Sequence, residues 1–470
     1  MNLARSNLLW CLLLLAVAVA ATLIGWTGFI ASDDALYHAG ATEWLRDPPF
    51  PGGDHWTTRF PLVLSFAGVI ALMGDGFAAF ATTAVLFYLT LVGTMGAFGR
   101  SIGGARTGWI TALIAATLPV VVAQATTVGV DLLEASLLLA GIALLTRAEP
   151  RIAHALAAGV CFGLAMLCRE TTALPLVGLV PLFLLGRPVG RGALVAAGLG
   201  AAAVLGAEAL FQGLVTGDPL RRYAIAFNHD STIDRAANLE GNLLVHPAID
   251  PLLVLLINND FGLLFWGAIA ALAAGAHRRI GLSARPRAIV LAAMAGASFL
   301  LVAVLTTKLV LNPRYFMLPA LAAVLLVAVW LDRLATRWRV LALAALTASN
   351  LLLLSAGNAH PRWPMEALVA AARAHPNETV HGEPEDANRA PLALRFAGAG
   401  RLDARPALKG ALLIVPADRA PSGRVLARYP SPPTRLGALI RAVGLEPLLP
   451  EGVARRLLRP NPTMVLVRAG

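Results

Sequence analysis

Long apolar runs alternate with short polar segments along the first 355 residues of the chain. The runs are about 15 to 25 residues long, and a helix needs roughly 20 residues to cross the hydrocarbon core of a bilayer. Ala, Leu and Gly fill these runs without the alternation of apolar and polar positions that a membrane β-barrel requires. The pattern predicts an all-α polytopic membrane protein with about eleven transmembrane helices, near Leu8–Ile30, Phe77–Gly99, Thr107–Gln124, Asp131–Thr146, Ile152–Cys168, Thr172–Gly186, Gly192–Val215, Pro251–Gly275, Ala288–Thr306, Tyr315–Leu331 and Trp338–Leu354.

Composition agrees with this pattern. Hydrophobic residues make up 57% of the chain and charged residues 14%, whereas soluble proteins carry about 25% charged residues. The net charge of +11 is spread over short loops and a C-terminal tail, without a basic run or interleaved aromatic residues. No nucleic-acid partner is therefore expected. Cys11, Cys161 and Cys168 lie in apolar segments and predict neither a disulfide nor a metal site.

The first apolar run resembles a signal peptide in position. It is longer than a usual signal-peptide core, and no exported soluble domain follows it directly, so an uncleaved first span is favoured.

Loop charges predict the orientation in the membrane. Cytoplasmic loops carry the excess of Lys and Arg. With the N-terminus inside, the inner loops hold many arginines and, as acids, only Glu149 and Asp332. Nearly every other acid of the membrane region, from Asp33 to Asp250, lies on the opposite side. An odd number of spans then places the C-terminus outside.

After about Ser355, Pro, Arg and polar residues return. Short apolar strands such as 411–415 and 464–467 alternate with helical patterns such as Met365–Ala374. This predicts a small extracytoplasmic α/β domain over residues 356–470, following a membrane domain over residues 1–355. Two outer loops, 31–76 and 216–250, are long, and long ordered loops often carry function.

Two adjacent carboxylates, Asp33 and Asp34, follow the first span. They repel each other and are costly to desolvate, so one of them is a candidate proton acceptor with a raised pKa. The alternative is a solvated helix start, because Asp is favoured at N-caps and in first turns. Residue type alone does not separate these two interpretations.

Further along the first loop, Asp54, His55 and Arg59 precede an apolar stretch that ends at Met73 and is too short to span. An interfacial or re-entrant helix fits this stretch. Arg59 would lie at headgroup level, where its guanidinium suits a phosphate. Taken alone, Arg59 is better explained as a snorkelling arginine or as a contact with a lipid headgroup. Zinc bound by Asp54 and His55 is a weak hypothesis, because neither has further ligands at suitable spacing.

Charged residues also occur at the outer ends of later spans. Asp131 and Glu134 are three residues apart, which places both carboxylates on one helix face. Arg169 lies on the outer side, where positive charge is disfavoured, so it requires either an acid of the protein or an anionic ligand. Inter-helix ion pairing explains each residue singly. Together they predict an outward-facing cleft, with carboxylates for proton transfer and cations that bind an anion. The other residues expected at this cleft are Glu170, Lys308, Arg314 and Tyr315.

Six segments in order along the chain carry a resemblance to a known family: Asp33–Tyr37, Thr58–Leu62 with Leu72–Gly74, Asp131, Gly163–Thr171, Thr216–Leu220 and Pro313–Pro319. They resemble segments of the glycosyltransferase-C superfamily, in particular the family 39-like membrane glycosyltransferases that include aminoarabinose transferases and protein O-mannosyltransferases. The sequence departs from the pattern in its Asp-Asp pair, where Asp-Glu is commoner. Thr58 also stands where some relatives have Glu.

The resemblance implies transfer of a sugar from a polyprenyl-phosphate carrier to a lipid, glycan or protein acceptor at the periplasmic face of a bacterial inner membrane, with inversion. Asp33, or Asp34 as its alternate, would be the general base. The carrier phosphate would be bound by Arg59, Arg169, Lys308 and Arg314. The substrate would contact Tyr37, His55, Asp131, Glu134, Glu170 and Tyr315.

Family members that use a divalent metal place it near the acidic pair, so the resemblance would place such an ion on Asp33 with Asp131 or Asp54. Metal dependence is the less favoured expectation, because many relatives are not metal-dependent. The main rival function is a transporter or flippase of lipid-linked or anionic solutes. Transporters tend to place their sites at the bilayer midplane on broken helices in paired repeats, and the sequence shows no such repeat. A non-catalytic assembly protein leaves the arrangement of Asp33, Asp131 and Arg169 unexplained.

Overall fold

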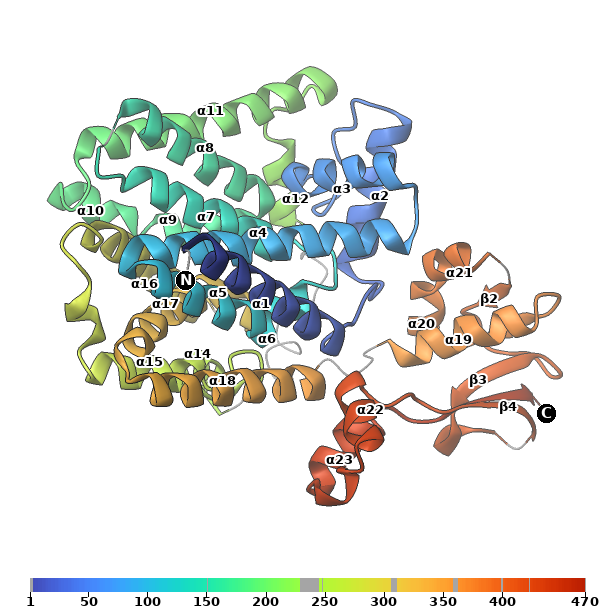
Figure 1. Cartoon of the computed structure of the whole chain (residues 1–470). Helices are drawn as coiled ribbons and strands as arrows, with labels where there is room; N and C mark the ends of the chain where they lie inside the picture. The colour runs from blue at the N-terminus through green and yellow to red at the C-terminus, as the bar shows by residue number, and fades with distance from the viewer. Residues whose placement is uncertain are drawn as a thin grey trace.

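A computed structural model of the chain describes residues 3–149, 151–228, 245–246, 248–305, 311–357, 362–398, 400–421 and 423–469. Residues 3–357 build a bundle of helices, most of which run side by side, and the C-terminal residues form a smaller body at one end of it (Figure 1). The bundle contains α1 (Leu3–Ile24), α4 (Phe77–Gly103), α5 (Ala105–Thr117), α6 (Pro119–Gln124), α7 (Asp131–Leu145), α8 (Ile152–Cys168), η1 (Glu170–Thr172), α9 (Ala173–Leu176), α10 (Leu179–Leu185), α11 (Arg191–Thr216), α14 (Asp250–Ile257), α15 (Leu264–Ala273), η2 (Ala276–Arg279), α16 (Arg285–Val304), η4 (Pro313–Phe316), α17 (Met317–Arg333) and α18 (Thr336–Gly357).

The two long loops predicted on the outer side also contain helices. The first loop forms α2 (Asp33–Arg46) and α3 (Phe60–Met73), and α12 (Arg221–Asn228) follows α11. α3 has 14 residues, which is too short to span, as its apolar stretch predicts. Its inner face is buried, while Leu72 and Met73 at its end are exposed.

Five helices of the described residues are long and apolar enough to cross a membrane by length and composition: α4, α11, α16, η4 with α17, and α18. The other predicted spans coincide with shorter or interrupted helices. The molecule is a helical membrane protein in architecture, and the number of eleven spans remains a prediction.

Three predicted spans are interrupted, which corrects the expectation of continuous helices. The span at Thr107–Gln124 divides into α5 and α6, because Leu118 is extended before Pro119 and proline disfavours helical backbone in the preceding residue. The span at Thr172–Gly186 divides into η1, α9 and α10. The span at Pro251–Gly275 divides into α14 and α15 around residues 258–263.

Two of these breaks meet in space. The backbone N–H of Val120 donates to the carbonyl of Asp260 at 2.9 Å. Asn258 is extended, and Gly262 has a φ of 54°, a conformation that favours glycine. Backbone groups freed at a break need a partner when they are buried in a membrane domain. The hydrogen bond therefore pairs a backbone N–H at one break with a backbone carbonyl at the other.

The two ends of the bundle carry different charges. At one end, Arg106 pairs with Asp332, and the guanidinium of Arg287 donates to the carbonyls of Ser101 and Thr146, both at 3.4 Å. The opposite end of α7 begins at Asp131. The separation agrees with the loop charges, and the assignment of the first end to the cytoplasm remains a prediction.

Residues 363–469 contain a five-stranded sheet in the order β2-β1-β3-β5-β4. β1 pairs in parallel with β2 and β3, whereas β5 is antiparallel to β3 and β4. The predicted strands at 411–415 and 464–467 correspond to β3 and β5, and the predicted helix corresponds to α19. The elements are α19 (Trp363–Ala374), β1 (Thr379–His381), α20 (Pro384–Arg389), α21 (Pro391–Ala397), β2 (Arg401–Asp403), β3 (Leu412–Pro416), η5 (Ala417–Arg419), β4 (Gly423–Tyr429), α22 (Arg435–Ala442), η6 (Glu446–Leu448), α23 (Glu451–Leu458) and β5 (Met464–Ala469).

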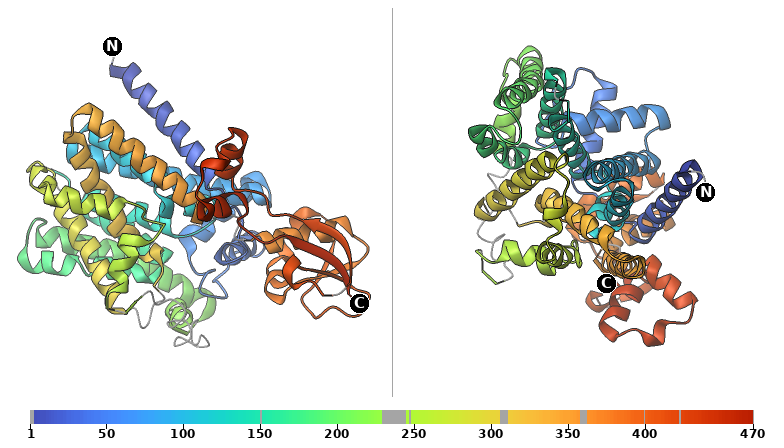
Figure 2. Two further views of the ribbon diagram at one scale, coloured as in Figure 1. Left: turned by 90° about the horizontal axis from the view of Figure 1, so that it is seen from below. Right: turned by 60° about the vertical axis from the view of Figure 1, so that its left-hand side comes forward.

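The C-terminal region contacts the first loop through α21. Arg395 donates to Asp75 at 2.7 Å, and the other oxygen of Asp75 lies 2.6 Å from Nε2 of His38 on α2. The ring of Phe396 packs 4.9 Å from Phe77 and 5.8 Å from His38, measured between ring centroids. Figure 2 shows the sheet beyond the end of the helical bundle, on the side of these contacts. The contact joins the C-terminal region to the helix that begins with Asp33.

We expect Phe396→Ala to loosen this contact. The substitution removes ring contacts with Phe77 and His38 and should cost about 1–3 kcal/mol. Hydrogen exchange of α2 and α21 in the detergent-solubilised protein should become faster. Phe227→Ala is the control, because Phe227 is 82% exposed. Unchanged exchange in Phe396→Ala would show that the ring does not hold the two parts together.

Candidate functional site

A buried ion pair lies where α7 begins and α8 ends. Nη1 of Arg169 is 2.6 Å from Oδ1 of Asp131 and 3.8 Å from Oε2 of Glu134. The two acids lie on one face of α7, as their spacing predicts. The Thr172 hydroxyl donates to the other oxygen of Glu134 at 2.6 Å. Arg169 therefore has acidic partners within the protein.

A second pair of charges adjoins the first. Arg314 on η4 lies 3.3 Å from Oδ2 of Asp33. The ring of Tyr315 lies 5.4 Å from the guanidinium carbon of Arg169 and 5.7 Å from that of Arg314. Nε of Arg314 is buried and has no hydrogen-bond partner among the described residues. Arg314 thus retains donor capacity while one of its amino groups faces an acid.

These side chains line a pocket between α7, α9, α16 and α17. Its polar wall consists of Asp131, Glu134, Arg169, Arg314 and Tyr315, and the remaining wall is largely apolar, with Ala135, Leu138, Leu174, Pro175, Val302, Met317 and Leu318 alongside Thr171 and Ser298. The loop charges predict these five polar residues on the outer side, in three separate segments of the chain. The structure brings them together.

The adjacent acids Asp33 and Asp34 point to different surroundings. Asp34 is buried, and its carboxylate accepts backbone N–H bonds from Ile30 and Ser32 at 2.8 Å and from Ala35 at 3.0 Å. These bonds close a turn in which Ala31 has a φ of 53°, a left-handed conformation that costs a non-glycine residue about 1–2 kcal/mol. Asp34 stabilises the turn, whereas Asp33 faces Arg314.

Burial raises the pKa of Asp34 to about 6, against the opposing effect of the three backbone N–H bonds, and the nearby Asp33 raises it further. The sequence-based expectation of one perturbed acid thus applies to Asp34. A carboxyl held by three backbone donors is poorly placed to accept a proton from a substrate, and this geometry favours Asp33 for that role.

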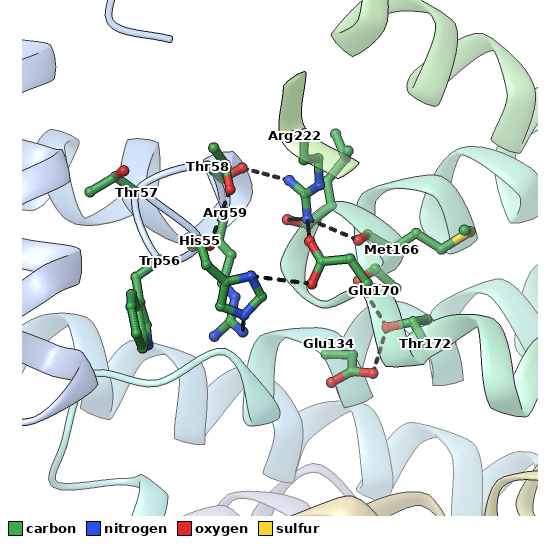
Figure 3. A network of polar contacts seen from close by, with 12 residues as sticks. His55, Trp56, Thr57, Thr58, Arg59, Glu134, Met166, Glu170, Thr172 and Arg222 are labelled. Carbon is green, nitrogen blue, oxygen red and sulfur yellow. Dashed lines mark hydrogen bonds and ion pairs between the residues drawn. The ribbon is translucent and has the colours of Figure 1, made fainter. Parts of the chain in front are cut away.

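A second polar network lies beside the pocket (Figure 3). Arg59 donates to the hydroxyl of Tyr37 and contacts Nε2 of His55. Nδ1 of His55 lies 3.9 Å from Oε2 of Glu170, whose other oxygen accepts from Arg222 at 2.7 Å. Burial raises the pKa of Tyr37 to about 12, so its hydroxyl is neutral at physiological pH. The turn at residues 169–172 joins this network to the pocket.

Arg222 is a residue that sequence analysis missed. It is almost fully buried on α12 and also donates to the carbonyls of Thr58 at 2.5 Å and Leu167 at 3.0 Å. Figure 3 shows it between the first loop and the end of α8. Its sequence signal was the same as that of Arg169: an arginine on the side of the membrane where the loop charges predict mainly acidic residues.

The candidate metal ligands do not fit a metal site. Asp33 faces Arg314, Asp131 pairs with Arg169, and Asp54 accepts the backbone N–H groups of Trp56 and Thr57 at 2.9 and 2.8 Å. No group of three or more His, Cys, Asp or Glu side chains with metal-binding geometry occurs among the described residues. Lys308 lies outside the described residues.

The arrangement provides the elements of acid-base and anion chemistry in one place. Asp33 is partly exposed beside a pocket that contains the buried Arg169 and the half-buried Arg314. Nε of Arg59 is also buried and unpaired within the described part of the chain. Guanidinium groups with spare donors suit phosphate oxygens.

Comparison with solved structures identifies the fold. ArnT from Cupriavidus metallidurans matches in the apo state with a TM-score of 0.57 and 16% identity, over 90% of this chain and 96% of ArnT. The same protein bound to undecaprenyl phosphate matches with a TM-score of 0.58 and 16% identity, over 89% and 96%. The Archaeoglobus fulgidus oligosaccharyltransferase in complex with Zn and sulfate matches with a TM-score of 0.51 and 15% identity, over 82% of this chain and 62% of that one.

These likenesses confirm the resemblance to the glycosyltransferase-C superfamily at the level of the fold. In sequence, residues 28–251 match a family described as "Predicted membrane protein (DUF2142)". No curated protein matches the sequence. The chain is therefore a helical membrane protein of the glycosyltransferase-C type in fold.

We expect Asp34 to make stability depend on pH. In the unfolded chain its carboxyl titrates near 3.8, and in the folded protein near 6. The folded state binds more protons between these values, so stability should fall by about 3 kcal/mol as the pH rises from about 4 to 6, and then level off. Asp34→Asn does not ionise and should remove this fall, measured as the thermal unfolding midpoint in detergent.

Asp47→Asn is the matched control, since the exposed Asp47 lies at the other end of α2. Its profile should follow that of the wild type. An Asp34→Asn profile with the wild-type slope between pH 4 and 6 would contradict the assignment.

Proposed function

We propose that this protein is a membrane glycosyltransferase that transfers a sugar from a polyprenyl-phosphate donor to an acceptor, with inversion at the anomeric carbon. The reaction takes place at the periplasmic face of a bacterial inner membrane, and residues 356–470 form an extracytoplasmic domain on that face. The acceptor is a lipid, a glycan or a protein.

One observation carries the proposal: the acid Asp33 lies 3.3 Å from Arg314 at a pocket that also contains Arg169. A transfer from a lipid phosphate needs a base and cations at the same place. ArnT, which shares the fold, has been crystallised bound to undecaprenyl phosphate. The fold and the charges of the pocket therefore support the same class of donor.

Asp33 acts as the general base. It takes the proton from the acceptor hydroxyl as the acceptor oxygen attacks the anomeric carbon, and the bond between this carbon and the phosphate oxygen breaks with its electron pair leaving on the phosphate. A single displacement of this kind inverts the anomeric configuration. Asp34 fixes the turn that orients Asp33.

Arg314 stabilises the leaving polyprenyl phosphate. Its unpaired Nε and its position against Asp33 allow it to exchange an acid for a phosphate oxygen. Arg169 adds positive potential and is held in place by Asp131. Arg59 has a buried, unpaired Nε as well and binds phosphate from the side of the first loop, with Lys308 as a further candidate.

The remaining polar groups contact the sugar or the acceptor. Tyr315 and Glu134 face the pocket directly. Tyr37 and His55 contact Arg59, and Glu170 lies next to His55, so this network positions Arg59 and is the second set of candidate substrate contacts. Asp131 holds Arg169 in place and is available to sugar hydroxyls.

The transporter or flippase is the second candidate, and the broken helices favour it. α5 with α6 and α14 with α15 are interrupted and meet at Val120 and Asp260, and transporters use broken helices at their sites. The charged pocket, however, lies at helix ends such as the start of α7. The glycosyltransferase accounts for both the fold and the position of these charges.

We expect Asp33→Asn to lower transfer by about 10²–10⁴-fold, as removal of a general base does. The assay reconstitutes the protein in proteoliposomes with a panel of radiolabelled polyprenyl-phosphate sugars and candidate acceptors. Asp47→Asn on the same helix is the control and should keep wild-type activity. Full transfer by Asp33→Asn would remove the base assignment. Failure of the wild type with every donor, accompanied by solute flux, would favour the transporter.

We expect Arg314→Gln to lower kcat by about 10²–10³-fold, because it removes a cation at the leaving phosphate. Arg314→Lys should retain part of the activity, since it keeps the charge but loses the planar donor set. Arg46→Gln, which changes an exposed arginine on α2, is the control. Equal activity of Arg314→Gln and wild type would place the phosphate elsewhere.

A further inference from the structure

A helical hairpin interrupts the C-terminal sheet. Between β4 and β5 the chain leaves the sheet, forms α22, η6 and α23, and returns. Figure 1 shows α22 and α23 next to the end of α18, at some distance from the sheet, and the left view of Figure 2 shows them apart from it. We call residues 430–463 the hairpin.

The hairpin is attached to the membrane helices. The hydroxyl of Ser355 on α18 donates to that of Thr434 at 3.0 Å, and the backbone N–H of Thr434 donates to the carbonyl of Leu457 at 2.8 Å. α22 contacts α1 and α18, and α23 contacts α18. A Cβ at Gly437 would lie 2.2 Å from the Leu457 carbonyl, so α22 and α23 approach each other closely.

This attachment fixes the depth of the hairpin. α18 has 22 residues and is therefore about 33 Å long, close to the roughly 30 Å of a hydrocarbon core. Its last turn, where Ser355 lies, then reaches the membrane surface on the side of the C-terminal sheet. The hairpin is bound to that turn and lies at the same level.

The free surface of the hairpin is apolar and basic. Leu439, Val443, Leu445 and Leu448 are 47–77% exposed, while Leu457 and Leu458 are buried. Residues 430–463 contain five arginines and two glutamates, a net charge of +3. The arginines are all exposed: Arg435, Arg441, Arg455, Arg456 and Arg459.

The helices next to the hairpin also expose apolar side chains. α1 and α18, to which the hairpin is bound, expose Leu13, Leu15, Leu23 and Leu352. Exposed leucines are expected on helices that face lipid. Leucine and arginine side chains together suit the boundary between acyl chains and anionic headgroups, where apolar groups insert and basic groups meet phosphates.

We propose that the hairpin is an interfacial element whose apolar residues insert into the lipid layer and whose arginines bind anionic headgroups, on the face of the membrane that carries the C-terminal sheet. It gives the C-terminal region a membrane contact of its own. The proposal is independent of the glycosyl transfer proposed above.

The test compares two leucines of equal exposure. Leu448 is 77% exposed on the hairpin, and Leu408 is 78% exposed in the turn before β3. Each is changed to cysteine in full-length protein whose three native cysteines are replaced by alanine, labelled with an environment-sensitive fluorophore, and placed in nanodiscs of phosphatidylcholine with phosphatidylglycerol. Lipid with a nitroxide at carbon 5 of an acyl chain serves as the quencher.

The label at position 448 should be blue-shifted and quenched at least about twofold more than the label at 408. Arg455→Gln with Arg456→Gln, or nanodiscs without phosphatidylglycerol, should reduce this quenching. Equal quenching at both positions would overturn the proposal. Quenching that changes neither with the two arginine substitutions nor with removal of phosphatidylglycerol would overturn the role of headgroup charge.

A label at 448 that is shielded from aqueous iodide but not quenched by the nitroxide lipid would indicate a protein partner, such as a second copy, and would also overturn the proposal. If the cysteine-free protein does not fold, hydrogen exchange of residues 435–458 in the unaltered chain replaces the label. Exchange should be slower in anionic than in zwitterionic nanodiscs, and equal exchange would count against the proposal.

Discussion

The buried ion pair between Arg169 and Asp131 determines how the helices around the pocket meet. Two charges removed from water are stable only together, and the loss of one partner leaves the other uncompensated at a cost of about 3–5 kcal/mol. Arg169 begins the turn at residues 169–172, so the pair also fixes that turn against α7. This turn also brings Thr172 into hydrogen-bonding contact with Glu134 and Glu170 into an ion pair with Arg222. Through these contacts, and through the bond from Arg222 to the carbonyl of Thr58, the turn connects α7, α8, α12 and the first loop.

Much of the helical architecture was predictable, because span length follows from bilayer thickness. The predicted helix at Ile152–Cys168 coincides with α8, and that at Asp131–Thr146 with α7 to within one residue. The breaks were missed because the apolar runs continue through them. Pro119 and the polar residues near 258–260 were the available signals. Apolar composition sets where a segment lies, whereas hydrogen-bond partners such as Val120 and Asp260 decide whether it stays helical.

The sequence predicted which residues belong to the site, but it did not predict which of them contact one another. The three-residue spacing correctly placed Asp131 and Glu134 on one face. The different surroundings of Asp33 and Asp34 could not be predicted from the sequence. They depend on the turn at Ala31, and the residue types in this turn do not indicate its left-handed conformation. Contacts between distant residues were equally hidden: Arg395 meets Asp75 across 320 positions.

The contact of α21 with the first loop has a consequence for how the protein is made. A ribosome releases the chain from its N-terminus, so α2 leaves it more than 300 residues before Phe396. The membrane helices can be inserted in order while α2 still lacks the aromatic ring and the guanidinium that complete its surroundings. The helix that begins with Asp33 therefore reaches its final packing only after the C-terminal sheet region has been synthesised and folded. The packing of this helix is in this way completed late in biogenesis, although its residues are among the first to be synthesised.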